Sequence, residues 1–163
     1  MRMKILKMMA WLRVGMLYLG AMLVGNVAWE AFHLPLYTVW ETSPSAYLMF
    51  VVVHCTVGDL MIGASALFTA AVLVGRNGPQ SEYACVAFFT VVFGLSYTLF
   101  SEWLNVSVRG SWAYAANMPV VPLLGIGLSP ILQWIVIPIV SFMWVRTQKI
   151  FASPWAVDAP NAE

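Results

Sequence analysis

The sequence predicts an all-α integral membrane protein, a bundle of four transmembrane helices that forms one domain over residues 1–163. Hydrophobic residues make up 61% of the chain and charged residues only 9%, whereas a soluble domain carries about 25% charged residues. Several apolar runs exceed the roughly 18 residues that mark a spanning helix. The sequence also lacks the basic patch that nucleic-acid binding requires, so a nucleic acid is not an expected partner.

The first span is expected at residues 14–36, where Pro35 closes an apolar run. Four basic residues precede the run: Arg2, Lys4, Lys7 and Arg13. This start resembles a secretory signal whose best cleavage site follows Ala28. Asn26 would then occupy the −3 position, which normally holds a small residue. We therefore expect the segment to be retained as the first span.

Three further spans are expected at residues 46–74, 83–104 and 119–145. The second contains the small residues 63–66, which suit close helix packing in a membrane. Glycine and proline in 75–82 predict a turn before the third span. The fourth span is interrupted early by Pro122 and Pro130, and neighbouring helices can tolerate such kinks.

The basic residues predict an orientation. Four spans place both termini on one side, together with the turn at 75–82. Seven of the eight Lys and Arg residues then lie on that side: Arg2, Lys4, Lys7, Arg13, Arg76, Arg146 and Lys149. Only Arg109 lies on the other side. Because cytoplasmic loops carry the excess of basic residues, we expect cytoplasmic termini. The short loops favour a multi-pass protein of a bacterial inner membrane.

Asn26, Glu30 and His33 are spaced four and three residues apart, so they share one helix face. A charge against lipid costs about 2.5–3.5 kcal/mol, and this face is therefore expected to look into the protein interior. At about 1.5 Å of rise per residue, His54 and Glu102 reach the same outer half of the membrane, and Asp59 lies just past the middle. The sequence thus predicts a polar site in the outer half.

Two chemistries fit these residue types. The first is a transition-metal site, because Glu-x-x-His is a spacing that carboxylate-bridged metal bundles use. Its candidate ligands are Glu30, His33, His54, Asp59 and Glu102. The second is proton transfer to a lipid or isoprenoid, since a carboxylic acid held neutral in an apolar pocket can protonate a weak base such as an alkene. The candidate catalytic residues are Glu30, Glu102 and His54.

The polar residues also have a non-enzymatic interpretation. Buried polar groups often join membrane helices by hydrogen bonds, so the chain could instead be a subunit or assembly protein, as a homo-oligomer or within a membrane complex. Gln133 is expected to bond to a neighbouring helix, and Cys55 and Cys85 to be packed thiols. Five residues are expected to support the site in any case: Asn26, Asn105, Arg109, Trp112 and Tyr114.

The segments at 29–40, 54–59 and 101–114 resemble those of small four-span bacterial membrane proteins, a resemblance that implies no activity. A shorter resemblance is to membrane carotenoid hydratases and cyclases. Those enzymes place an acidic residue before a Gly-x-Trp-x-Tyr loop and a Pro/Gly-rich final span. The matching positions are Glu102, Gly110, Trp112, Tyr114 and the stretch from Pro119 to Pro130. This resemblance implies acid–base chemistry on an isoprenoid, although the final span here has no acidic residue.

Overall fold

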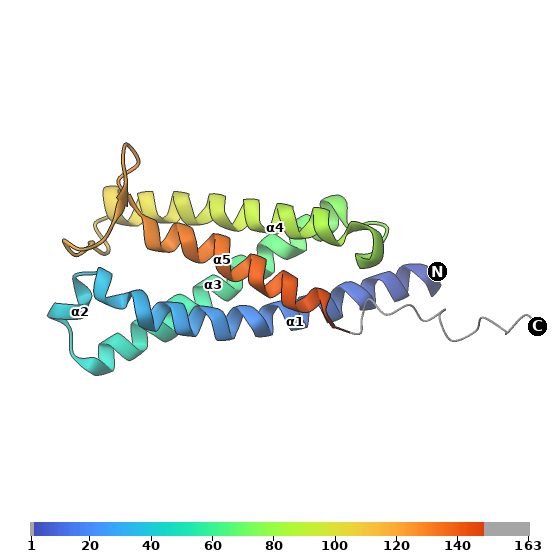
Figure 1. Cartoon of the computed structure of the whole chain (residues 1–163), viewed down its shortest axis with the longest axis horizontal. Helices are drawn as coiled ribbons and strands as arrows, with labels where there is room; N and C mark the ends of the chain where they lie inside the picture. Colours follow the sequence, from blue (N-terminus) through green and yellow to red (C-terminus); the bar gives the residue numbers. More distant parts are fainter. Residues whose placement is uncertain (1, 149–163) are drawn as a thin grey trace, which may run out of the picture.

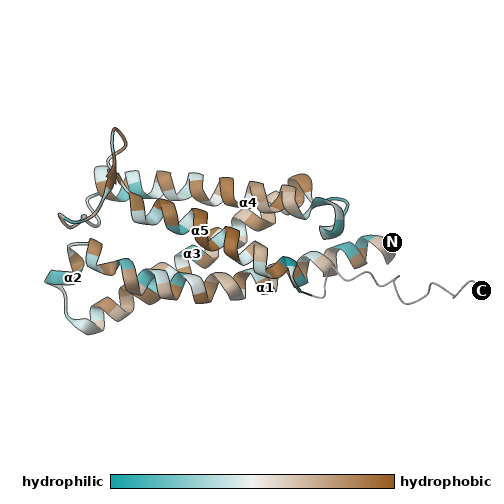
Figure 2. Cartoon of the chain, viewed as in Figure 1, coloured by the Kyte–Doolittle hydropathy of each residue, from teal (hydrophilic) through white to brown (hydrophobic). Residues whose placement is uncertain are grey.

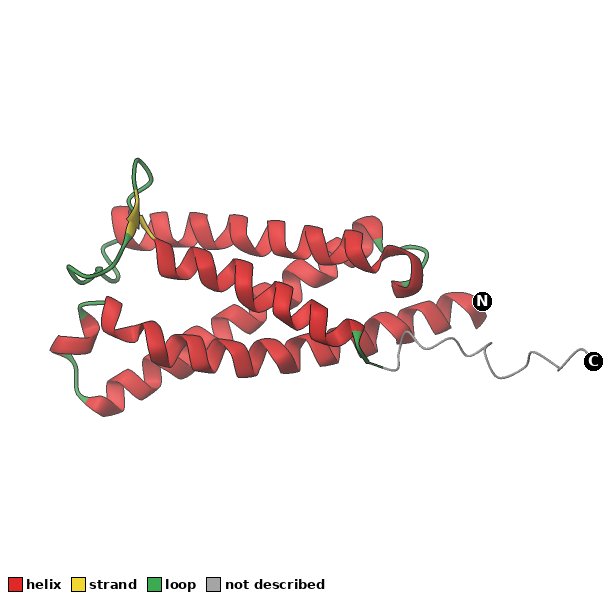
Figure 3. Ribbon diagram, viewed as in Figure 1, coloured by secondary structure: helices red, strands yellow, loops and turns green. Residues whose placement is uncertain are grey.

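The computed structural model describes residues 2–148, so Lys149 lies outside the described residues. The chain is almost entirely helical (Figure 3). The elements follow in the order α1 (Arg2–His33), the 3₁₀ turn η1 (Leu34–Leu36), α2 (Val39–Thr42), α3 (Ser45–Val74), α4 (Pro79–Glu102), the π-helical segment η2 (Trp103–Val108), β1 (Val120–Val121), β2 (Ile126–Gly127) and α5 (Leu128–Arg146). Four helical stretches, α1, α3, α4 with η2, and α5, are long and apolar enough to cross a membrane. This confirms the predicted class of a helical protein with four such helices.

The four long helices form a ring in which α1 and α4 each pack against both α3 and α5 (Figure 1). Their shared core is built from buried apolar side chains, among them Val14, Tyr18 and Met22 of α1. Small residues bring the helices together. A Cβ atom added at Gly25 would lie 2.8 Å from the Ile137 side chain of α5, so the α1–α5 contact depends on the missing side chain.

The two ends of the molecule differ in structure and in charge. The start of α1, the turn between α3 and α4 and the end of α5 lie at one end (Figure 1). Hydrophilic colouring gathers at the first two of these segments (Figure 2). The opposite end holds α2 and the hairpin. There the two connecting segments are joined by backbone hydrogen bonds, from Thr38 N to Ala113 O (3.0 Å) and from Ala115 N to Leu36 O (2.9 Å).

The first and third helices are longer than predicted. The helix α1 begins at Arg2 instead of residue 14, because the basic segment holds good helix formers and neither Gly nor Pro. Its 32 residues span about 48 Å, which exceeds the roughly 30 Å of a hydrocarbon core. The helix α4 begins at Pro79 instead of residue 83, and η2 continues it to Val108.

The predicted start of the fourth span is corrected by the structure. The helix α5 begins at Leu128, nine residues after the predicted start at 119. Residues 119–127 instead form a hairpin in which Val120 pairs with Gly127 and Val121 pairs with Ile126. Prolines at 119 and 122 lack the N–H that a helix requires, and Leu123 and Gly125 adopt positive φ angles of 72° and 64° that reverse the chain. The 19 residues of α5 still span about 28 Å.

Candidate functional site

The polar residues of three helices meet at Gln133 of α5. Its side-chain nitrogen lies 2.9 Å from Asn26 Oδ1, 2.9 Å from Glu30 Oε1 and 3.0 Å from Asp59 Oδ2. Trp134 Nε1 donates a further hydrogen bond of 3.2 Å to Asp59 Oδ1. An amide nitrogen carries only two hydrogens, so three acceptors share two donors. We name Asn26, Glu30, Asp59, Gln133 and Trp134 the Gln133 cluster; it joins α1, α3 and α5.

A second set of contacts extends from Glu30 toward the end of α1. His33 Nε2 lies 3.1 Å from Glu30 Oε2, and His33 Nδ1 lies 2.9 Å from Ser129 Oγ of α5. The exposed fractions are 5% for Glu30, 9% for His33 and 8% for Ser129. We name these three residues the Ser–His–Glu row. The row shares Glu30 with the Gln133 cluster. The Gln133 amide therefore helps to hold the Glu30 carboxyl group in place.

Trp29 determines how protons can be arranged along the row. Its Nε1–H donates to Ser129 Oγ over 3.2 Å and so occupies an acceptor position of that hydroxyl. The Ser129 hydroxyl can then donate to His33 Nδ1, and His33 Nε2–H can donate to the Glu30 carboxylate. In this tautomer, the unprotonated His33 Nδ1 can accept the Ser129 proton, and the Glu30 carboxylate orients the imidazole ring.

One end of the row reaches the molecular surface through a groove of about 390 Å³ between α1 and α5. We name it the α1–α5 groove; it is lined by Gly25, Ala28, Trp29, Phe32, His33, Leu36 and Ser129. Phe32 is 87% exposed at its edge. The Ser129 and His33 end of the row is thus reachable from an apolar groove on the outside of the helix bundle, whereas neither Glu30 nor Gln133 lines it.

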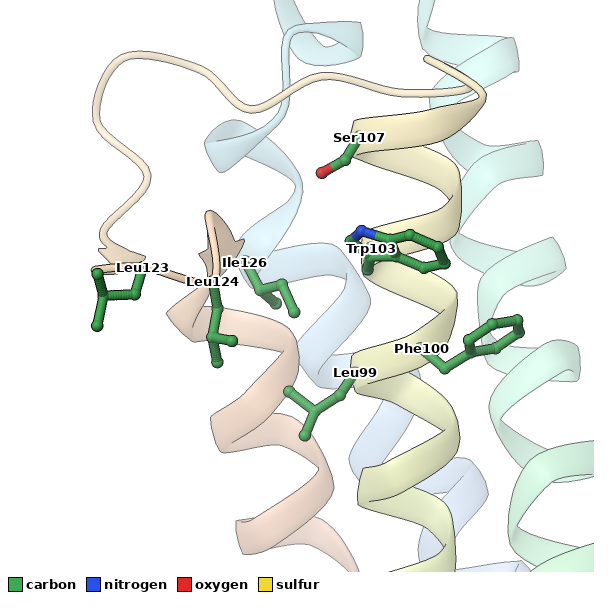
Figure 4. A pocket seen from close by; sticks show the side chains of 7 residues that line it. All are labelled: Leu99, Phe100, Trp103, Ser107, Leu123, Leu124 and Ile126. Carbon is green, nitrogen blue, oxygen red and sulfur yellow. The ribbon is translucent and has the colours of Figure 1, made fainter.

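A larger groove of about 530 Å³ lies between the hairpin and the end of α4 (Figure 4). Leu99, Trp103 and Ser107 occupy successive turns on one side, and Leu124 and Ile126 lie on the other. No titratable side chain is among its lining residues. This hairpin groove therefore offers a hydroxyl, on Ser107, without a base beside it.

The buried Glu102 lies near the far end of the molecule and accepts a hydrogen bond from the Tyr114 hydroxyl. The Tyr114 ring contacts the Tyr37 ring edge-on, with centroids 5.5 Å apart, and Tyr37 contacts the His33 ring at 5.3 Å. Burial raises the pKa of both phenols, and the charge of Glu102 raises the pKa of Tyr37 further. Both tyrosines therefore stay neutral, and Tyr114 keeps a proton to donate to Glu102.

The structure brings together four of the predicted site residues: Asn26, Glu30, His33 and Asp59. His54 does not join them; it is exposed on α3, and its ring stacks on Phe50 with centroids 5.4 Å apart. The reason is rotation about the helix axis. Residues 54 and 59 are five positions apart, and at 3.6 residues per turn they point about 140° away from each other. Depth in the membrane, on which the predicted grouping of these residues rests, does not show in which direction each side chain points.

Some of the predicted supporting residues also lie beside a predicted site residue, and others do not. Tyr114 bonds to Glu102 as described, and the exposed Trp112 lies beside the same carboxyl group. Asn105 instead donates back to the Ser101 carbonyl over 2.9 Å. Arg109 is exposed, and it pairs with no carboxylate among the residues whose side chains the structure describes.

The predicted metal-ligand set is not assembled. With His54 on the outer face of α3 and Glu102 bonded to Tyr114, the five candidate ligands are divided among separate places. Within the part of the chain that the structure describes, no three His, Cys, Asp or Glu side chains lie close enough to hold a metal ion.

Sequence reasoning missed Ser129, Trp134 and Tyr37, and it gave Gln133 only a bond to one neighbouring helix. A signal for two of them was available. Ser129 and Gln133 are four residues apart and share one face of α5, by the same spacing that pointed to Asn26 and Glu30.

No protein-family profile, curated protein or solved structure matches the chain. The fold and the site therefore define only a class: a helical protein with four helices able to cross a membrane, and a buried polar site that opens into an apolar groove.

Proposed function

We propose that the chain is a multi-pass enzyme of a bacterial inner membrane that carries out acid–base chemistry on a lipid or isoprenoid in the α1–α5 groove. The observation that carries this proposal is the contact of His33 with both Glu30 and Ser129 at the floor of that groove. A histidine oriented by a carboxylate is a common general base in enzymes. Here it would take a proton from a group bound in the groove and return it later in the reaction.

The position of the groove supports a membrane substrate. It is bordered by residues of two helices that are long and apolar enough to cross a membrane, and most of its lining side chains are apolar. A water-soluble substrate would gain little from this lining, whereas an acyl or isoprenoid chain would bury apolar surface at about 25 cal/mol per Å². The expected partner is therefore a component of the bilayer.

The charge distribution supports the orientation. Lys4, Lys7 and Arg13 lie on the first turns of α1, Arg76 lies in the turn before α4, and Arg146 ends α5, all toward the same end of the molecule (Figure 1). With cytoplasmic termini by the positive-inside rule, the α1–α5 groove would open in the outer half of the membrane.

A second candidate function is favoured by the Gln133 cluster. One amide contacts oxygens of two other helices at 2.9–3.0 Å, which is the kind of contact that holds membrane helices together. In this alternative the chain is a non-enzymatic subunit or assembly protein, as a homo-oligomer or with a membrane partner, and the Ser–His–Glu row contributes to the same structural network.

Glu30→Gln separates the two candidates, with the exposed Glu41→Gln as matched control. Each protein would be purified in mild detergent, incubated with bacterial lipid extract and examined by lipid mass spectrometry and thermal melting. The enzyme proposal expects wild type and Glu41→Gln to convert a lipid and Glu30→Gln to lose at least about tenfold in rate, with the helices retained. Absence of lipid conversion by wild type, together with a lower melting temperature only for Glu30→Gln, would favour the structural alternative.

A further inference from the structure

We propose that Ser129 is a nucleophile and that the substrate is an acyl ester of a membrane lipid, which transfers its acyl group to Ser129 Oγ. This inference rests on the proposed acid–base function and narrows it to acyl transfer or ester hydrolysis. It requires that Ser129 Oγ itself attack the substrate, which general acid–base catalysis by His33 does not require.

The contacts of Ser129 match the roles that activate a serine. A nucleophilic hydroxyl needs a base within hydrogen-bond reach, and the base needs a third group that orients it. Ser129 Oγ lies 2.9 Å from His33 Nδ1, and Glu30 Oε2 lies 3.1 Å from the other ring nitrogen. Such a triad is recognised by its geometry and not by the order of its residues in the chain.

The position of Ser129 on α5 favours the charge that develops during acyl transfer. Ser129 is the second residue of α5. The first turn of a helix forms the positive end of the helix dipole. In this turn Leu128 N–H donates to Pro119 O over 2.7 Å and Pro130 has no N–H, which leaves the Ser129 N–H and the dipole to act on a nearby charge. Attack on a carbonyl creates an oxyanion, which would form beside this turn and be stabilised there.

The reaction balances with water or an alcohol as the only co-reactant. Ser129 Oγ forms a bond to the ester carbonyl carbon while its proton moves to His33 Nδ1. The ester C–O bond then breaks, and the leaving alcohol takes that proton from His33. Water or a second alcohol attacks the acyl-serine, again giving its proton to His33, and the proton returns to Ser129 Oγ as the fatty acid or new ester leaves. Glu30 stabilises the imidazolium in both halves.

The α1–α5 groove offers an apolar binding surface for the acyl chain of the substrate. Ser129 and His33 lie beside Ala28, Phe32 and Leu36 in the same lining. An acyl chain against these side chains would bring its carbonyl to Ser129 from the bilayer, without passing through water. The hairpin groove has Ser107 but no base, and it therefore provides an internal control.

The test is labelling with a long-chain alkyl fluorophosphonate, which reacts with activated serines. The full-length protein in detergent would be treated, and the adduct located by peptide mass spectrometry. We expect one phosphonyl group on Ser129, no adduct in Ser129→Ala, and labelling at least about tenfold slower in His33→Ala. Ser107→Ala, the matched control, should label like wild type. Because the adduct is located in the wild-type protein, the identity of the labelled serine does not depend on whether a variant folds.

The outcomes separate this inference from the proposed function. An adduct on Ser129 that requires His33 supports it. An adduct on another serine overturns it. Absence of an adduct together with lipid conversion that persists in Ser129→Ala overturns the nucleophile and leaves the acid–base proposal standing. Absence of both an adduct and lipid conversion overturns both.

Discussion

The Tyr114 hydroxyl joins the loop between η2 and β1 to α4 by donating a hydrogen bond to the buried Glu102. Tyr114 lies outside the four candidate spans. Burial raises its pKa above the ordinary value of 10.0, and the hydrogen bond to Glu102 raises it further. Because the pKa is higher in the folded chain than in the unfolded chain, the resulting stabilisation is complete below about pH 10 and is lost as the pH rises toward the folded pKa.

The prediction at this site is a pH-dependent effect of Tyr114→Phe. The variant loses a hydrogen bond to a carboxyl group and should be less stable than wild type by about 1 kcal/mol at neutral pH. Wild type should keep this advantage up to about pH 10 and lose it as the pH rises further toward the folded pKa. Melting temperatures measured from neutral pH upward would check it, with the exposed Tyr97→Phe as control. A constant difference between wild type and Tyr114→Phe at every pH would contradict the proton linkage.

Local spacing predicts residues on one helix better than residues from different helices. Asn26, Glu30 and His33 could be found from sequence because their shared face depends only on helix geometry. The choice between His54 and Asp59 depends on how α3 is rotated. That rotation is set where Gly63 lies against α1, since a Cβ atom added at Gly63 would lie 3.4 Å from the Met22 side chain.

The sequence of α3 itself indicates which of its titratable residues faces the other helices. The buried face of α3 includes Asp59, Gly63, Ala66 and Ala70, which recur at helical spacing. His54 lies nine positions from Gly63, on the opposite side of the helix. The small residues that let α3 approach α1 therefore also identify which titratable residue faces inward. The contact between Ser129 and His33 has no such local signal, because 96 residues separate them.

At the scale of the elements, α4 and α5 meet where the Trp134 ring lies directly against Gly94. A methyl group at position 94 would overlap that ring, which is almost fully buried. Trp134 also donates its Nε1–H to Asp59. Helix packing and the Gln133 cluster are thus coupled through one side chain.

This coupling predicts that Gly94→Ala destabilises the bundle although alanine favours a helix. Overpacking a well-packed core typically costs about 1–3 kcal/mol, and a displaced Trp134 would also lose its bond to Asp59. Thermal melting followed by circular dichroism and tryptophan fluorescence would measure both effects. Gly20→Ala is the control, because a Cβ atom there would meet nothing within 4 Å. Equal melting temperatures for the two variants would show that α4 and α5 adjust freely.

The ends of a helix can be predicted from sequence where proline or glycine residues flank it. Residues 46–74 were predicted as a span and α3 covers Ser45–Val74, between Pro44 and Gly75. The predicted start of the fourth span is wrong because residues 119–127 are as apolar as a membrane-spanning helix. Hydropathy cannot distinguish a hairpin from a helix in such a stretch. The prolines and glycines were evidence for a turn and not merely for a kink.

At the scale of the whole molecule, basic residues gather toward the end that holds the start of α1, the turn before α4 and the end of α5 (Figure 1). The exposed Arg109 lies toward the other end, as does the His33 end of α1 with the α1–α5 groove. The orientation of the protein therefore decides which leaflet supplies a substrate to Ser129. The positive-inside rule predicts the outer leaflet.

Cysteine accessibility checks this orientation directly. In a background with Cys55→Ala and Cys85→Ala, single cysteines would replace the exposed Ser45, Ser111 and Asn77. We expect a membrane-impermeant maleimide on intact cells to label positions 45 and 111, and position 77 only after permeabilisation. The reverse pattern would place the groove in the inner half, and the lipid ester would then come from the cytoplasmic leaflet. Labelling of 45 and 77 from the same side would contradict a membrane-crossing α3, because this helix alone connects the two positions.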